Sequence, residues 1–200
     1  IQLNEQMDFA RILYNKGLYL QTLKILDRMK EMAKQYEQIT YMQQILFFEK
    51  KIESLYITRS IQDRADQLAN ESNTVDEKLS SISQLSNLSL QLYSWYIKHG
   101  VARNEREGNE AKKFFETNLP KHADQLTGFY EHLYLFQSHC WVAFIRQDYL
   151  LYYRYTQKWV DLFEKQPDMI EAETAHYIKG LHNLMSAHFD LNNEKKLNET

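Results

Sequence analysis

The sequence predicts an all-α fold built as an array of antiparallel helix hairpins, and three observations support this prediction. The 200 residues include only 5 Gly and 2 Pro, too few for the chain reversals that a sheet protein needs every 8 to 12 residues or so. Leu, Gln, Glu and Lys, which are all good helix formers, are abundant. Apolar residues recur at spacings of three and four rather than alternating, which is the helical period.

The first hairpin is expected over residues 1–37. An apolar stripe that starts at Leu3 and ends at Tyr14 predicts its first helix, and the residues up to Gly17 provide a turn. A second stripe, which continues to about Tyr36, predicts its second helix. Because the connection is only a few residues long, the two helices should be antiparallel neighbours.

A second hairpin is expected over residues 38–72. Its first helix should cover residues 39–57, and Ser60 should cap its second helix. The polar residues of segment 70–74 interrupt the apolar pattern, so the second helix should end there. The hairpin boundary is therefore placed within this polar segment.

The third hairpin is expected over residues 74–119 and opens with a long helix. Thr74 and Glu77 have the spacing of a capping box, which predicts the start of that helix. Asn104 and Glu107 have the same spacing and predict the start of its partner helix.

Two more hairpins are expected over residues 121–166 and 168–200. The first of them is the richest in aromatic residues. Asp168 and Glu171 are placed to cap the opening helix of the last hairpin, and a final helix is predicted to start at Glu194. Since that helix would begin only a few residues before the sequence stops, we expect the chain to be a fragment of a longer protein.

Two turn segments resemble the signature of tetratricopeptide repeats, in which a turn Gly is followed by an aromatic residue and then by a small residue. The first segment is Asn15-Lys16-Gly17-Leu18-Tyr19, with Thr22 and Leu26 after it. The second, Arg146-Gln147-Asp148-Tyr149 with Trp141, Ala143 and Trp159, has no Gly and repeats the layout more loosely. The resemblance covers nearly the whole chain and implies a single helical-repeat domain over residues 1–200, stacked as a right-handed α-solenoid. Corresponding positions lie roughly 40 to 48 residues apart, whereas the usual repeat has about 34. Longer helices, or a related class of helical repeat, would explain this spacing.

Such an array has a concave surface lined by the first helix of each hairpin, which suits an extended peptide or a helix. The resemblance implies that a partner protein binds there. Carried over residue by residue, the groove-lining positions are Asn4, Met7, Arg11, Tyr14, Tyr134, Gln137, Trp141, Phe144 and Asn183. For Trp141 and Phe144, a position in the core is the stronger interpretation because both side chains are large and apolar.

The histidines and the cysteine give no metal or cofactor site. His132 and His139 are seven residues apart, and the three histidines of segment 176–188 are six apart, so neither set has the i, i+4 spacing of a helical zinc site. Cys140 occupies a position where the repeat family prefers a small packed residue. A buried structural thiol is therefore expected.

A catalytic site is not expected either. Glu173 and His176 have the Glu-x-x-His spacing of helical di-iron proteins, but such a site needs a second pair, and the sequence has none. The pair is therefore expected on a solvated helix face. The sequence also has no Gly-Lys-Ser/Thr element for cradling a phosphate.

Charge and hydropathy narrow the classes of partner. The net charge is -3, with 24 basic and 27 acidic residues, which provides no positive surplus for binding nucleic acid. No stretch approaches the roughly 18 apolar residues of a membrane span. A single cysteine forms no internal disulfide and favours a reducing compartment. We therefore expect a cytoplasmic protein that binds neither nucleic acid nor membranes.

Three functions remain open from the sequence. The leading hypothesis is a scaffold or adaptor that holds a partner peptide or helix in the concave groove. The alternative is a ligand- or peptide-responsive sensor domain of a larger bacterial regulator. An enzyme is the third and the least supported. Self-association is also possible, because an uncapped repeat end exposes apolar surface.

Overall fold

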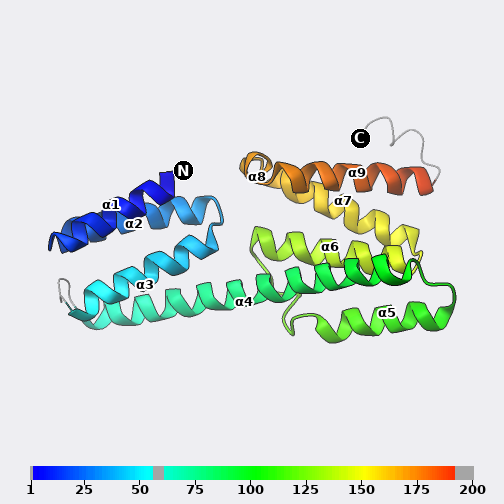
Figure 1. Ribbon diagram of the computed structural model, residues 1–200, viewed down its shortest axis with the longest axis horizontal. Coiled ribbons are helices and arrows are strands. Elements are labelled where there is room, and N and C mark those ends of the chain that lie inside the picture. Colours follow the sequence, from blue (N-terminus) through cyan, green and yellow to red (C-terminus); the bar gives the residue numbers. More distant parts are fainter. Residues whose placement is uncertain (1, 56–60, 192–200) are drawn as a thin grey trace. The chain divides into compact units, whose positions relative to one another are not determined.

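The computed structural model describes residues 2–55 and 61–191, and within them the chain is helical and has no strand (Figure 1). This confirms the all-α prediction. The helices are α1 (Gln2–Asn15), α2 (Tyr19–Gln35), α3 (Ile39–Leu55), α4 (Ile61–His99), α5 (Glu105–Asn118), α6 (Phe129–Ile145), α7 (Tyr149–Lys165), α8 (Asp168–Ala172) and α9 (Thr174–Asp190).

The chain forms two compact units, residues 1–80 and 81–200, and α4 contributes residues to both. Across the described ranges, no helix combines the length and the apolar content that a membrane crossing requires. The predicted cap at Ser60 and the predicted helix from Glu194 both lie outside the described ranges.

In the first unit, α1 packs against α2 and α2 packs against α3. The turn between α1 and α2 contains Gly17, whose φ of 75° lies in the left-handed region that glycine adopts without steric cost. This confirms the predicted turn. Leu23, Leu26, Ile45 and Ile52 are completely buried and form the centre of this unit's core.

The predicted interruption of segment 70–74 is wrong, because α4 continues through it. Ser72 is buried, and its hydroxyl accepts a hydrogen bond of 2.6 Å from the Lys50 ammonium. The Thr74 hydroxyl donates to the carbonyl oxygen of Asn70 one turn earlier, so it does not cap a new helix. Val75 packs into the core. Tertiary contacts thus keep a polar segment helical although its residues favour caps and turns.

Four charged residues join α2, α3 and α4 within the first unit. Glu49 is fully buried, and its carboxylate contacts the Lys30 ammonium at 2.6 Å and the Arg64 guanidinium at 3.1 Å. Lys30 also contacts Glu71 at 2.9 Å. These contacts tie α4 to both α2 and α3, and they pair the buried charges, which are tolerated only in pairs.

In the second unit, α6 packs against α5 and α7, and α7 packs against α9. The predicted cap of α5 is confirmed: the Asn104 side chain accepts a hydrogen bond from the backbone N–H of Glu107. The turn between α6 and α7 contains Gln147 with a φ of 57°, and the Asp148 side chain caps α7. Phe129 and Phe163 are fully buried and meet edge to face at 5.0 Å in the core of this unit.

The last predicted hairpin begins differently from the prediction. Pro167 precedes α8, and no side-chain hydrogen bond caps this helix, so the predicted capping by Asp168 is wrong. The helix is also interrupted at Glu173, where φ is -130° and ψ is 41°, before α9 starts. The Glu173 side chain is thereby held at the start of α9, beside the site described next.

Candidate functional site

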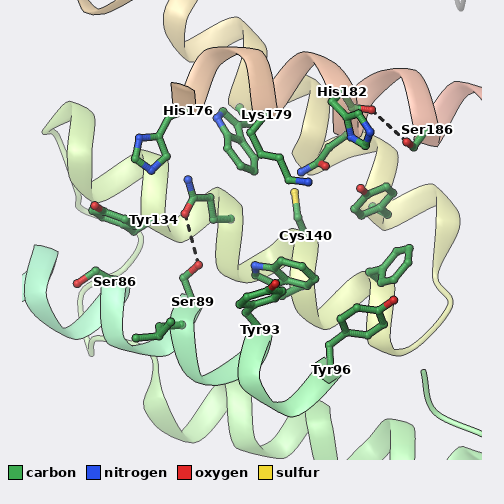
Figure 2. A pocket seen from close by; sticks show the side chains of 17 residues that line it. Ser86, Ser89, Tyr93, Tyr96, Tyr134, Cys140, His176, Lys179, His182 and Ser186 are labelled. Atoms are coloured by element: carbon green, nitrogen blue, oxygen red, sulfur yellow. Dashed lines mark hydrogen bonds between the residues drawn. The ribbon is translucent and has the colours of Figure 1, made fainter. Parts of the chain in front are cut away.

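A pocket of about 520 Å³ lies in the second unit, between the C-terminal half of α4, α6 and α9 (Figure 2). Helix α7 contributes two buried aromatic side chains to it. The lining residues are Ser86, Ser89, Leu90, Tyr93, Tyr96, Tyr134, Gln137, Cys140, Trp141, Phe144, Tyr152, Trp159, His176, Lys179, His182, Asn183 and Ser186.

Helical spacing explains why these side chains meet. Residues three and four apart lie on one face of a helix. The α6 residues in the pocket follow this spacing from Tyr134 to Phe144, and the α9 residues follow it from His176 to Ser186. Each helix therefore contributes one continuous stripe of side chains.

The α4 and α6 side of the pocket is aromatic. The ring of Trp141 lies 4.8 Å from the Tyr93 ring and 5.7 Å from the Tyr96 ring, measured between centroids. Phe144 meets Tyr96 edge to face at 5.3 Å and lies 5.5 Å from Tyr152. These rings form one continuous packed surface, for which the ring separations are favourable.

The α9 side of the pocket is polar. Figure 2 shows His176, Lys179 and His182 projecting from α9 on the side opposite Ser89, Tyr93 and Tyr96. The pocket thus has an aromatic wall and a facing wall rich in hydrogen-bond donors.

One carboxylate adjoins the polar wall without lining the pocket. The Glu173 carboxylate lies 2.9 Å from Nδ1 of His176, and it accepts a hydrogen bond of 2.8 Å from the Tyr130 hydroxyl. The predicted placement of Glu173 and His176 on a solvated face is wrong in part, because their side chains are only 25% and 36% exposed and Tyr130 of α6 binds Glu173. Burial, assisted by the charge of Glu173, raises the pKa of Tyr134.

Cys140 and Trp159 are buried residues of the lining, and Gly180 of α9 lies against Trp159. Cys140 is buried, as predicted, and burial raises the pKa of its thiol, which favours the neutral form. Trp159 is only 4% exposed, and its Nε1 has no hydrogen-bond acceptor among the residues that the structure places. Gly180 lets the α9 backbone approach this indole: a Cβ at position 180 would lie 3.1 Å from Cδ1 and Nε1 of Trp159.

We predict opposite effects of a Gly→Ala replacement at the two helical glycines. In a helix interior, Ala is more stable than Gly by up to about 1 kcal/mol. Gly108→Ala should raise the free energy of unfolding by most of this amount, because the nearest neighbours of its Cβ would lie at 3.8 Å and beyond. Gly180→Ala should instead lower the free energy of unfolding by about 1 kcal/mol, because the buried indole has to move. Urea unfolding followed by tryptophan fluorescence measures both, and equal gains in the two variants would contradict the close approach.

Five of the predicted groove residues line this one pocket: Tyr134, Gln137, Trp141, Phe144 and Asn183. The core interpretation of Trp141 and Phe144 is wrong in part, because both side chains are half-buried and each has a face on the pocket. Gln137 is buried, and its amide oxygen accepts a hydrogen bond of 3.4 Å from the Ser89 hydroxyl.

The other predicted groove residues lie in the first unit. Met7, Arg11 and Tyr14 line a second hollow, of about 400 Å³, between α1 and α3. Asn4 is not part of its lining, and its amide oxygen accepts a hydrogen bond from the Tyr41 hydroxyl.

Sequence reasoning missed the α4 residues Tyr93 and Tyr96 and the α9 residue Lys179. A signal for Lys179 was present, since it lies four residues before the predicted Asn183 and three after His176, on one helix face. No such signal marks the α4 residues, because their contacts with Trp141 join segments more than 40 residues apart.

The arrangement is chemically suited to binding. It provides aromatic area, several donors and one ammonium group, and the residues with determined placement include no group of three or more side chains able to hold a metal ion. Comparisons of the chain with models of protein families, with curated proteins and with solved structures found no match in any of the three.

Proposed function

We propose that this chain is a protein-binding module of the tetratricopeptide-like kind, a scaffold or adaptor whose antiparallel hairpins stack as a right-handed α-solenoid and hold a partner segment on the concave face. One observation carries the proposal: three helices of the second unit, α4, α6 and α9, each present a stripe of side chains to one aromatic pocket. The pocket residues of α4, α6 and α9 lie in segments predicted as the opening helices of the third, fourth and fifth hairpins, although α4 also includes the segment predicted as the second helix of the second hairpin and α8 precedes α9. Opening helices are the ones that line a solenoid's concave face.

The first unit supports the same arrangement independently. Its hollow is lined by α1 and α3, which open the first two predicted hairpins. Arg11, Phe47 and Lys51 are exposed around it. A module that binds through opening helices would have such a surface in each unit.

The chemistry of the pocket favours binding over catalysis. The Cys140 thiol is held neutral by burial, as its raised pKa indicates, and His176 is tied to the Glu173 carboxylate. The proposal therefore includes neither an enzymatic step nor a cofactor. We further propose a cytoplasmic location, because a single buried thiol is stable in a reducing compartment.

A second function, a sensor domain that responds to a small ligand or a peptide, is favoured by the size of the pocket. Its volume of about 520 Å³ is within the range of roughly 300–1,000 Å³ typical of ligand sites. In a sensor, ligand binding would change the affinity for a separate effector, whereas a scaffold requires only that the partner be held.

The proposal is tested by affinity capture from native lysate with the wild-type chain and two double variants, followed by mass spectrometry. Tyr134→Ala/Gln137→Ala removes two pocket side chains. Tyr36→Ala/Gln35→Ala removes the same residue types from the exposed C-terminal end of α2 and is the matched control. Circular dichroism must show that both variants are folded.

We expect a protein that the wild type and the control capture and that the pocket variant loses, with an affinity at least about tenfold weaker, since central interface residues cost upward of roughly 1.4 kcal/mol. Equal capture by all three chains would show that the pocket is not the binding surface. Capture by none of them would favour the sensor, which a thermal-shift screen of small ligands and peptides would then examine.

A further inference from the structure

We infer that the α4/α6/α9 pocket selects an acidic peptide segment that carries an aromatic or large aliphatic anchor beside its carboxylate. The inference rests on the proposed function and adds the chemistry of the partner. It is carried by the charge of the lining, by the division of the pocket into two walls and by an exposed apolar ridge that leads out of it.

The lining contains one ammonium group, that of Lys179, and no carboxylate. It also includes the imidazoles of His176 and His182, whose rings carry hydrogen-bonding nitrogens. Glu173 adjoins the pocket, and its two oxygens already contact His176 and Tyr130. A carboxylate brought in by a partner would therefore meet donors without competing with an acid in the lining, and charge-assisted hydrogen bonds are the strongest that such donors form.

The two walls require a partner with two kinds of group. The aromatic wall around Trp141 is suited to bury an apolar side chain of the partner. Lys179 faces this wall from α9 (Figure 2). An acidic residue next to an aromatic or aliphatic residue matches both walls at once. A uniformly apolar segment would leave the donors of α9 covered without acceptors, and each such group costs about 1–3 kcal/mol.

The apolar surface continues beyond the pocket along α4. Leu90 and Tyr93 line the pocket at its edge and are 65% and 43% exposed, and Ile97, one turn further on, is 63% exposed. The spacing of three and four places these side chains on one face of α4. A small ligand would fill the pocket and leave this ridge uncovered, whereas a peptide several residues long would cover both.

Aromatic rings also attract cations, so a basic partner is the competing possibility. Two observations weigh against it. Trp141 packs against Tyr93 at 4.8 Å and against Tyr96 at 5.7 Å, so these rings contact one another and do not form an open cage. A basic side chain would also meet the Lys179 ammonium, with no acid in the lining to balance it.

The test is a selection from a library of random 12-residue peptides by messenger-RNA display, run in parallel on four forms of the full chain. These are the wild type, Lys179→Glu, Tyr134→Ala/Gln137→Ala, and Lys165→Glu, which reverses an exposed charge at the end of α7 outside the pocket. We expect the wild type and Lys165→Glu to enrich acidic peptides that contain Phe, Trp, Tyr or Leu. Lys179→Glu should bind these peptides at least tenfold more weakly and should enrich basic ones instead.

Each other outcome has a separate meaning. If neutral or basic peptides are enriched and Tyr134→Ala/Gln137→Ala loses them, the inference fails and the proposed function stands. If no peptide is enriched above a selection without protein, the proposed function fails as well. Selected peptides resynthesised with an amidated C-terminus should keep their affinity. A loss on amidation would show that the pocket binds a chain end, which would overturn the assignment to an acidic side chain.

Discussion

Replacing Lys30 by Met should lower the free energy of unfolding by about 3 kcal/mol at pH 7, within the range measured when one partner of a buried ion pair is removed. Burial already raises the pKa of Glu49, although Lys30 and Arg64 oppose the shift. Without Lys30, the carboxyl group would stay partly unpaired or take up a proton, and protonation costs about 1.36 kcal/mol for each pH unit above its ordinary pKa. Urea unfolding followed by circular dichroism measures the loss.

The same helix provides the control. Lys34→Met makes an identical change at a residue that is 50% exposed and whose contact with Glu31 is 3.5 Å long, so it should change the stability by less than about 0.5 kcal/mol. At pH 5 the deficit of Lys30→Met should shrink to about 1 kcal/mol or less, because protonating Glu49 is then cheap. If Lys30→Met and Lys34→Met are equally stable at pH 7, the buried network does not hold the three helices together.

Acidification from pH 7 to pH 4.5 should lower the free energy of unfolding of the second unit by about 2 kcal/mol through His139 alone. Burial, assisted by the charge of Lys158, lowers the pKa of His139 to about 4 from an ordinary value of 6.5. The ring stacks on Tyr155 at 3.7 Å and lies 4.7 Å from the Phe115 ring. Between pH 6.5 and 4 the unfolded chain therefore binds a proton that the folded chain does not, so stability falls as the pH falls through this window.

His139→Phe keeps an aromatic ring at this position and removes the titration. The three tryptophans all lie in the second unit, so their fluorescence reports its unfolding in urea at both pH values. Between pH 7 and pH 4.5, the free energy of unfolding of the variant should fall by about 2 kcal/mol less than that of the wild type, since the carboxyl groups titrate alike in both. Identical pH dependence in the two chains would show that His139 is protonated in the folded state.

The helical period of the apolar residues and the turn residues were sufficient to predict most of the helices and their ends. Gly17, Asn104 and Asp148 act locally, since each either terminates or caps a helix through its own backbone or side chain. Predictions from neighbouring residues failed where contacts with distant residues determine the secondary structure. The polar segment of α4 stays helical because Lys50, 22 residues from Ser72, binds its hydroxyl, and Glu71 in the same segment pairs with Lys30.

The sequence predicted which site residues share a face of one helix, but not which helices come together to form the site. Tyr134, Gln137 and Trp141 follow one another at helical spacing, so placing one of them placed the others. The approach of Tyr93 and Tyr96 to Trp141 depends on how α4 packs on α6, and no periodicity within one segment contains that information. The bend at Glu173, whose carboxylate is bound by Tyr130 from 43 residues away, has the same origin.

The buried thiol of Cys140 has a practical consequence for labelling. It is the only cysteine in the sequence, is 3% exposed and has a pKa raised by burial, so a maleimide can react with it only when the pocket opens. A cysteine introduced on the surface would therefore take up a dye without removal of the native one. The rate at which Cys140 is modified would in turn report how often the pocket opens. A bound partner that keeps the pocket closed would lower this rate.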